Sequence, residues 1–160
     1  MAQPALQSVP APKSRLDLTV ALLGGKARLN RQVRSALEAH ALLADGLPNS
    51  ALSHLLDKLI LLRLDDQLAR VIGMSARTVQ RHKSVPKDCL DREQSGRAWK
   101  FAEVLARATQ VLGDQEQAER WMLAPALGLS GWQPLDLLAT PAGLAMVEEH
   151  LDRLEYGVYV

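Results

Sequence analysis

The chain has 160 residues, of which 48% are apolar, so it is long and hydrophobic enough to bury the core of one domain or of two small ones. Leucine and alanine supply 52 residues, whereas valine, isoleucine and threonine supply 17, and only six residues are aromatic. This composition excludes a wholly disordered chain and favours helices over a sheet. We expect an all-α protein.

Several classes of protein are disfavoured at the same stage. The single cysteine, Cys89, cannot close an intramolecular disulfide or complete a thiolate zinc site. No apolar run approaches the roughly 20 residues needed to cross a bilayer. Residues 1–12 have neither the basic segment nor the long apolar stretch of a secretory signal. We therefore expect a cytoplasmic protein that has no membrane partner.

The net charge of +1 conceals an uneven distribution along the chain. Residues 1–100 contain 16 Lys and Arg against 9 Asp and Glu, a balance of +7, whereas residues 101–160 contain 3 against 9, a balance of −6. A basic half favours a polyanionic partner, and an acidic half favours a different one, such as a basic protein surface. The alternative is that both halves are ordinary solvated faces.

The N-terminal third contains only weak signals of secondary structure. Residues 1–15, with three prolines among the first twelve, are expected to form a flexible arm. Residues 16–48 are assigned to an N-terminal helical region that could serve in dimerisation. Within it, the apolar run 16–23 is compatible with a strand, a helical turn or a dimer contact. Apolar residues then recur at helical spacing from a candidate N-cap at Asn30 to Ala44.

A DNA-binding domain is predicted over residues 49–95. It begins with a helix over 49–62 that carries a broad apolar stripe. Residues 68–83 then have the pattern of a helix-turn-helix. Gly73 suits the left-handed turn between the two helices, Met74 fills the corner, and Ser75 caps the second helix.

The second helix of this motif has the polarity of a recognition helix. With Val79 pointing inward, a rotation of about 100° per residue places Arg77 and Arg81 on the opposite face. Arginine can bind the O6/N7 edge of guanine, and glutamine can bind adenine. Lys83, with Arg70, is expected to meet phosphate, and His82 to pack as a neutral imidazole. The candidate DNA-binding residues are Ser75, Arg77, Thr78, Gln80, Arg81 and Lys83. The alternative is a helical corner with a solvated basic face.

The remaining residues, 96–160, predict further helices. Asp91 and Gln94 have capping-box spacing and open a long helix toward Gly113, and another helix begins at Asp114. An irregular segment covers 126–133. Thr140 and Pro141 supply the N-cap and N1 residues of a last helix that Gly157 can end. The three tryptophans are expected to be core or interdomain contacts: Trp99, Trp121 and Trp132.

Several short sequences in this region occur in a distinctive order. They are Trp-Met-Leu-Ala-Pro at 121–125, Pro-Leu-Asp-Leu-Leu at 134–138 and Glu-Tyr-Gly-Val-Tyr at 155–159. With Arg-Thr-Val at 77–79 and Gly-Asp at 113–114, the chain resembles Xre/MbcA/ParS-type antitoxins over about residues 47–160. It departs from their pattern between Pro125 and Pro134. There, Leu129 and Ser130 are like an insertion, and Trp132 stands where a basic residue is commoner.

The resemblance implies a Cro-like helix-turn-helix domain followed by a small helical toxin-binding domain at 96–160. It also implies a cognate RES-domain toxin that depletes NAD and is inactive in the complex. An enzyme that binds NAD needs cationic groups for the pyrophosphate and an apolar slot for the nicotinamide, and an acidic, aromatic tail could fill such a site. The toxin-contact residues carried over are Arg153, Glu155, Tyr156, Val158, Tyr159 and Val160. The alternative is that the two tyrosines only pack the helix end.

The main hypothesis is therefore an antitoxin that inhibits its toxin directly and represses its own operon. One recognition helix reads too few base pairs, so operator binding requires a homodimer or a hetero-oligomeric complex with toxin. The rival is a dimeric helix-turn-helix regulator whose C-terminal domain only oligomerises, and a third possibility is an inhibitor that no longer binds DNA. The histidines are too dispersed for a metal site, no catalytic set is recognisable, and no enzyme activity or cofactor is expected.

Overall fold

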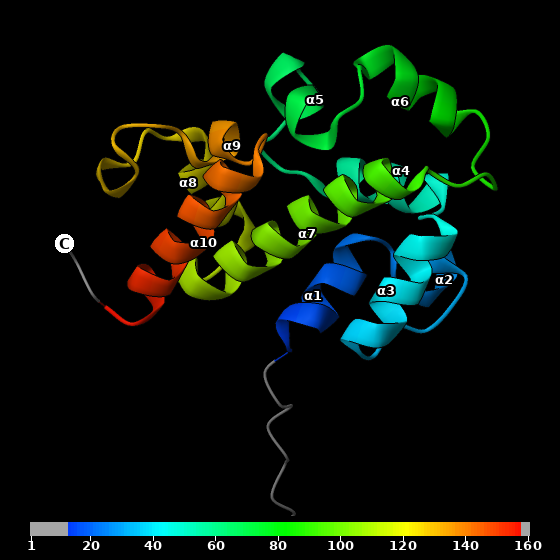
Figure 1. Cartoon of the computed structure of the whole chain (residues 1–160), viewed down its shortest axis with the longest axis horizontal. Helices are drawn as coiled ribbons and strands as arrows, with labels where there is room; N and C mark the ends of the chain where they lie inside the picture. The colour runs from blue at the N-terminus through cyan, green and yellow to red at the C-terminus, as the bar shows by residue number, and fades with distance from the viewer. Residues whose placement is uncertain (1–12, 158–160) are drawn as a thin grey trace, which may run out of the picture.

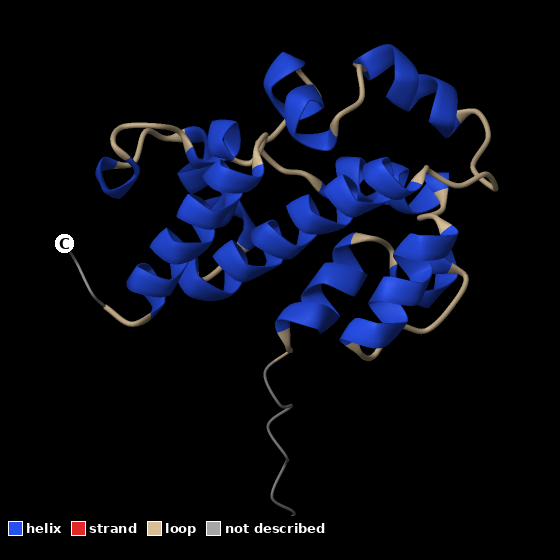
Figure 2. Cartoon of the chain, viewed as in Figure 1, coloured by secondary structure: helices blue, strands red, loops and turns tan. Residues whose placement is uncertain are grey.

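A computed structural model of the chain describes residues 13–157, and every regular element among them is helical (Figures 1 and 2). The expected all-α class is thereby confirmed. The elements in chain order are α1 (Arg15–Leu22), α2 (Gly25–Leu29), α3 (Ala36–Asp45), α4 (Asn49–Lys58), α5 (Asp66–Ile72), α6 (Ala76–Lys83), α7 (Arg92–Leu112), α8 (Gln115–Leu123), the 3-10 turn η1 (Leu127–Leu129), α9 (Pro134–Leu137) and α10 (Pro141–Glu155). Within 13–157, no helix is long and apolar enough to span a bilayer.

The long helix α7 organises the molecule. It begins at the predicted capping box, in which Asp91 accepts a hydrogen bond from the Gln94 N–H at 2.8 Å, and it ends at Gly113. It crosses the centre of the molecule in Figure 1 and packs against α1, α3, α5, α8 and α10. Its buried face, which includes Ala98, Phe101 and Leu105, therefore belongs to a core that both halves of the chain share.

The apolar run at 16–23 is a helix that packs on α7. Ser14 caps α1 through a reciprocal pair of hydrogen bonds with Asp17. Leu23, directly after α1, is fully buried. Residues 1–12 of the expected arm lie outside the described residues, whereas Ser14 and Arg15 belong to the start of α1.

The structure corrects the expected start of the next helix. Asn30 is not an N-cap but ends the short helix α2 in the left-handed region, with φ of 59°. Asparagine tolerates this conformation because its short polar side chain can hydrogen-bond locally. The cap of α3 is Ser35, whose hydroxyl accepts a hydrogen bond from the Glu38 N–H at 3.2 Å.

Two other expectations were wrong. The helix predicted over 49–62 ends at Lys58, because the backbone N–H groups of residues 60–62 bind a side chain from α8 instead of continuing the helix. Trp132 is not a core residue, since 57% of it is exposed. Trp99 is buried as expected, and its indole N–H donates to Glu103 at 3.0 Å.

Two helical glycines allow a paired test of this packing. A Cβ added to Gly96, in α7, would meet no atom within 4 Å, so Gly96→Ala is expected to stabilise the fold by about 0.5–1 kcal/mol. A Cβ on Gly143, in α10, would lie 2.0 Å from the Leu137 carbonyl oxygen, so Gly143→Ala should destabilise it. Thermal unfolding of both variants checks this pair, and a lower melting temperature for Gly96→Ala would contradict it.

Candidate DNA-binding helix and C-terminal interaction surface

Local capping signals define the helix-turn-helix. The Asp65 carboxylate accepts a hydrogen bond from the Leu68 N–H at 3.0 Å and begins α5. The Ser75 hydroxyl accepts one from the Thr78 N–H at 3.1 Å and begins α6. Between the helices, Gly73 has φ of 76°, the left-handed turn that the sequence predicted.

Helix α6 is buried on one side only. Val79 is buried in the core with Leu68, Ile72 and Met74, as expected. Arg77, Gln80 and Arg81 are exposed, and Thr78 is half-buried. In Figure 1, α6 lies at one end of the molecule with its outer side away from the other helices. The geometry thus presents two guanidinium groups and an amide to solvent from one helix.

The cations of α6 differ in their surroundings. Among residues 13–157, Arg77 and Arg81 form no ion pair, whereas Lys83 Nζ lies 3.7 Å from Asp57 Oδ1 of α4. His82 is half-buried as expected, and its Nε2 has no hydrogen-bond partner in the described part of the chain. Arg70, the other expected phosphate contact, lies 4.0 Å from Asp136. The two arginines are therefore the cations of this helix that are free to engage an external polyanion.

Backbone pairing anchors the C-terminal side of the motif. The Leu90 N–H donates to the Leu47 carbonyl at 2.8 Å, and the Asn49 N–H donates to the Asp88 carbonyl at the same distance. The Leu47 N–H donates to the buried Ser95 hydroxyl of α7 at 2.8 Å. These bonds close the loop after α6 onto the start of α4 and the first turns of α7.

A buried carboxylate anchors the N-terminal side. Glu119 of α8 is fully buried, and its oxygens accept hydrogen bonds from the N–H groups of Ile60 at 2.9 Å, Leu61 at 2.6 Å and Leu62 at 2.9 Å. Gln115 Nε2 adds a fourth donor at 2.7 Å. Among residues 13–157, Glu119 forms no ion pair, so neutral dipoles alone solvate the charge. We call this arrangement the Glu119 clamp.

Sequence reasoning missed the Glu119 clamp, although a signal for it exists. Glu119 is three residues before the buried Met122 and beside the buried Ala118, so it lies on the inward side of α8. An acidic residue at an inward position needs a local set of donors, because an unpaired buried charge is very costly. Nothing in the sequence indicates that those donors come from residues 60–62.

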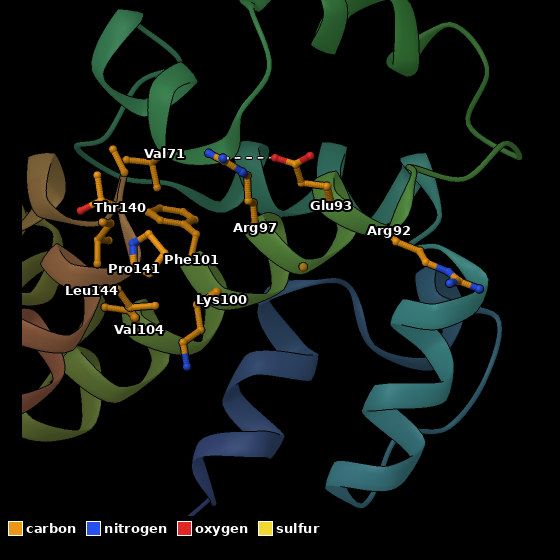
Figure 3. A pocket seen from close by; sticks show the side chains of 13 residues that line it. Val71, Arg92, Glu93, Arg97, Lys100, Phe101, Val104, Thr140, Pro141 and Leu144 are labelled. Atoms are coloured by element: carbon orange, nitrogen blue, oxygen red, sulfur yellow. Dashed lines mark ion pairs between the residues drawn. The ribbon is translucent and has the colours of Figure 1, made fainter.

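A pocket of about 310 Å³ lies where the helix-turn-helix meets the C-terminal helices (Figure 3). Its floor is apolar and includes Val71, Phe101 and Leu144, and Arg97 and Lys100 lie at its edge. Arg97 pairs with Glu93 at 3.2 Å. Burial opposes the charge on Lys100, but Glu148 and Glu103 outweigh it and raise its pKa. Arg97 and Lys100 are already paired, and Arg92, which also lines the pocket, donates to the Ala44 carbonyl at 3.2 Å, so the pocket is mainly an apolar seam between the two parts of the molecule.

Helix α10 is tied to α7 by Arg107. The Arg107 guanidinium group pairs with Asp152 and, at 3.2 Å, with Glu155. Burial opposes the charge on Arg107, but these two carboxylates outweigh it and raise the pKa of Arg107. Glu155, one of the predicted toxin contacts, is therefore already engaged within the molecule.

The structure describes only some of the predicted toxin-contact residues. Arg153 pairs with Glu149 on the same helix and is half-buried. Tyr156 is 77% exposed and does not pack against the helix end. Val158, Tyr159 and Val160 lie outside the described residues. The last described turn thus presents an aromatic side chain to solvent beside a partly paired acidic helix.

The loop between α8 and α9, residues 126–133, carries two exposed apolar side chains that sequence reasoning did not select. Leu127 is 98% exposed and Trp132 is 57% exposed. The loop packs on His150 of α10, whose ring stacks on Trp121 with centroids 6.0 Å apart. Burial, with the nearby charge of Arg153, lowers the pKa of His150 and so disfavours the charged imidazole at this contact.

The fold and these surfaces define a helix-turn-helix protein with a second helical unit built on the same core. A family model described as the antitoxin Xre-like helix-turn-helix domain matches residues 38–103. Another, described as the antitoxin Xre/MbcA/ParS C-terminal toxin-binding domain, matches residues 107–157. The chain therefore belongs to the Xre/MbcA/ParS-type antitoxins, as the sequence motifs suggested.

Curated relatives agree with this assignment. The chain is 28% identical over 127 residues to an "Antitoxin Xre" of Pseudomonas putida, an alignment that covers 79% of this chain and 76% of the relative. It is 31% identical over 94 residues to that of Yersinia enterocolitica, covering 58% and 63%. The corresponding protein of Photorhabdus laumondii is 29% identical over 92 residues, covering 57% and 62%.

The Glu119 clamp predicts a large difference between two glutamates on one helix. In Glu119→Gln, the amide supplies one acceptor oxygen, and its NH₂ group faces backbone donors, so we expect a loss of about 2–4 kcal/mol in unfolding free energy. Faster amide exchange at residues 60–62 should accompany it. Glu116→Gln is the control, since Glu116 is exposed and, within residues 13–157, pairs only with Arg120, and it should change stability by less than about 0.5 kcal/mol. Equal effects of the two substitutions would contradict the clamp.

Proposed function

We propose that this antitoxin neutralises a cognate RES-domain toxin that depletes NAD, by covering the toxin's active site, and that it represses its own operon through α6. The observation that carries the proposal is the separation of two exposed surfaces on one rigid core. Unpaired arginines of α6 lie at one end, and the exposed last turn of α10 lies at the other (Figure 1). The cytoplasm, where operator DNA is accessible, is the compartment that this function requires.

The DNA-binding part of the proposal rests on the polarity of α6. Arg77 and Arg81 are directed away from Val79 and compete with no carboxylate within the described chain. Lys83 can exchange its exposed pairing with Asp57 for a phosphate at little cost, because an exposed ion pair contributes about 0–1 kcal/mol. A single helix contacts only a few base pairs, so we propose that a homodimer or a toxin-bridged assembly spaces two copies about one duplex turn apart.

The toxin-binding part rests on the end of α10. Tyr156 is too exposed to serve the fold, and removing such an aromatic ring from water is favourable in a complex. The residues that follow are proposed to enter the slot in which the toxin binds the pyrophosphate and nicotinamide of NAD. Residues 96–160 would then form the toxin-binding domain and residues 49–95 the DNA-binding domain.

Operator binding tests α6. Arg77→Ala and Arg81→Ala should each weaken binding to the chain's own promoter by about 1–3 kcal/mol, roughly 5- to 150-fold, because each removes a bidentate base contact. Arg34→Ala is the control, since Arg34 is exposed outside the helix-turn-helix. Mobility shifts at fixed salt measure the difference. If the unaltered protein does not shift its promoter, the chain is an inhibitor without repressor activity.

Co-expression tests the tail. Deletion of residues 156–160 should abolish rescue of cells from the toxin encoded beside this gene, because the toxin's active site would stay open. Deletion of residues 1–12, at the other end of the chain, should leave rescue intact. If the protein without residues 156–160 still rescues the cells fully, the tail does not block the toxin's active site. If the neighbouring product is harmless or does not co-purify, the chain is a regulator whose C-terminal domain only oligomerises.

A further inference from the structure

The loop of residues 126–133 presents two large apolar side chains that the fold does not use. Leu127 is 98% exposed, and Trp132, five residues later on the same loop, is 57% exposed. Most exposed leucines on a protein surface are scattered singly and partly covered by neighbours. Here, one leucine has almost no intramolecular contact and lies five residues from an exposed tryptophan.

A buried leucine and a close contact with α10 hold the loop in place. Leu129, two residues after Leu127, is buried in the core. Gly128 lies so close to α10 that an added Cβ would come within 2.4 Å of the His150 ring. That ring is stacked in turn on Trp121, with an interplanar angle of 6°.

Backbone hydrogen bonds close the loop. The Ala126 N–H donates to the Trp132 carbonyl at 3.1 Å, and the Gly131 N–H donates to the Ala126 carbonyl at 2.9 Å. Ser130 and Gly131 turn the chain with positive φ of 55° and 82°. Leu127 and Trp132 therefore project from a fixed backbone, and a partner that binds them has little loop entropy to remove.

We propose that Leu127 and Trp132 form an apolar anchor for the cognate toxin, separate from the tail, and that this anchor selects which toxin the chain binds. The inference rests on the proposed function. Its occupant is a toxin surface with an apolar pocket that receives these two side chains. Residues 107–157, which include the loop, match a toxin-binding domain. The loop lies toward the end of the molecule that bears the last turn of α10, away from α6 (Figure 1).

A second copy of the chain is a poorer occupant. A stable homodimer needs about 800 Å² of contact per partner, which two side chains do not supply.

Selection follows from where the anchor binds. A tail inside an active site contacts the groups that every enzyme with the same chemistry needs. A loop outside that site contacts a surface that can differ between toxins, and such differences are the basis of specificity. A few well-packed residues carry most of the affinity of an interface, and tryptophan is among the residue types enriched there.

Affinity measurements with the purified cognate toxin test this proposal. Leu127→Ser and Trp132→Ser should each weaken binding about 10- to 100-fold, mostly through faster dissociation, while operator binding and melting temperature stay unchanged. Leu37→Ser is the control, because Leu37 is 76% exposed on α3 and is not part of the loop, and it should bind the toxin as tightly as the unaltered chain.

The other outcomes overturn the anchor in distinguishable ways. If a variant that carries both Leu127→Ser and Trp132→Ser binds the toxin as tightly as the unaltered chain, the proposed anchor is wrong and the proposed function stands. If the unaltered chain does not bind the toxin, both fail. If the substitutions leave toxin binding intact and change the mass of the isolated chain in light scattering, the loop is a contact between copies.

Discussion

The structure depends on a buried carboxylate that forms no ion pair among residues 13–157. Glu119 is fully buried, and three consecutive backbone N–H groups and the Gln115 amide point at its oxygens. Removing residues 60–62 from this carboxylate would leave the charge and the donors unsatisfied together, which is far more costly than losing one neutral hydrogen bond. Helix α8 and the segment that enters α5 therefore hold one relative position, and the helix-turn-helix is fixed to the C-terminal unit.

This anchoring joins two segments that family models describe separately. The boundary between them, residues 103–107, falls inside the uninterrupted helix α7. Phe101 and Leu105, on either side of the boundary, share one buried core. The pocket at the seam has an apolar floor, and Arg97 and Lys100 at its edge are paired, so the two parts meet through packing as well as through the Glu119 clamp. The antitoxin is thus one rigid body with an exposed surface at each end, and it does not need a flexible linker to present both.

Net charge alone describes these surfaces poorly. Much of the acidity of the C-terminal third is used internally, since Asp152 and Glu155 hold Arg107 and Glu148 holds Lys100. Exposed apolar groups, namely Leu127, Trp132 and Tyr156, are what this end offers a partner. At the other end, Arg77 and Arg81 remain unpaired within the described chain. The two ends differ chemically because one has unpaired cations and the other has uncovered apolar side chains.

Local sequence determined every feature whose cause lies within about four residues. Ser75 and Gly73 defined the helix-turn-helix, and Asp91 with Gln94 defined the start of α7, because caps and turns need only neighbouring backbone groups. Tertiary structure alone decided where α4 ends, because the acceptor for residues 60–62 is almost sixty residues away in α8. It also decided which apolar residues of the loop 126–133 are buried. Leu127 and Leu129 have the same side chain and nearly the same position in the chain, and only the helix beneath them makes one a core residue and leaves the other in water.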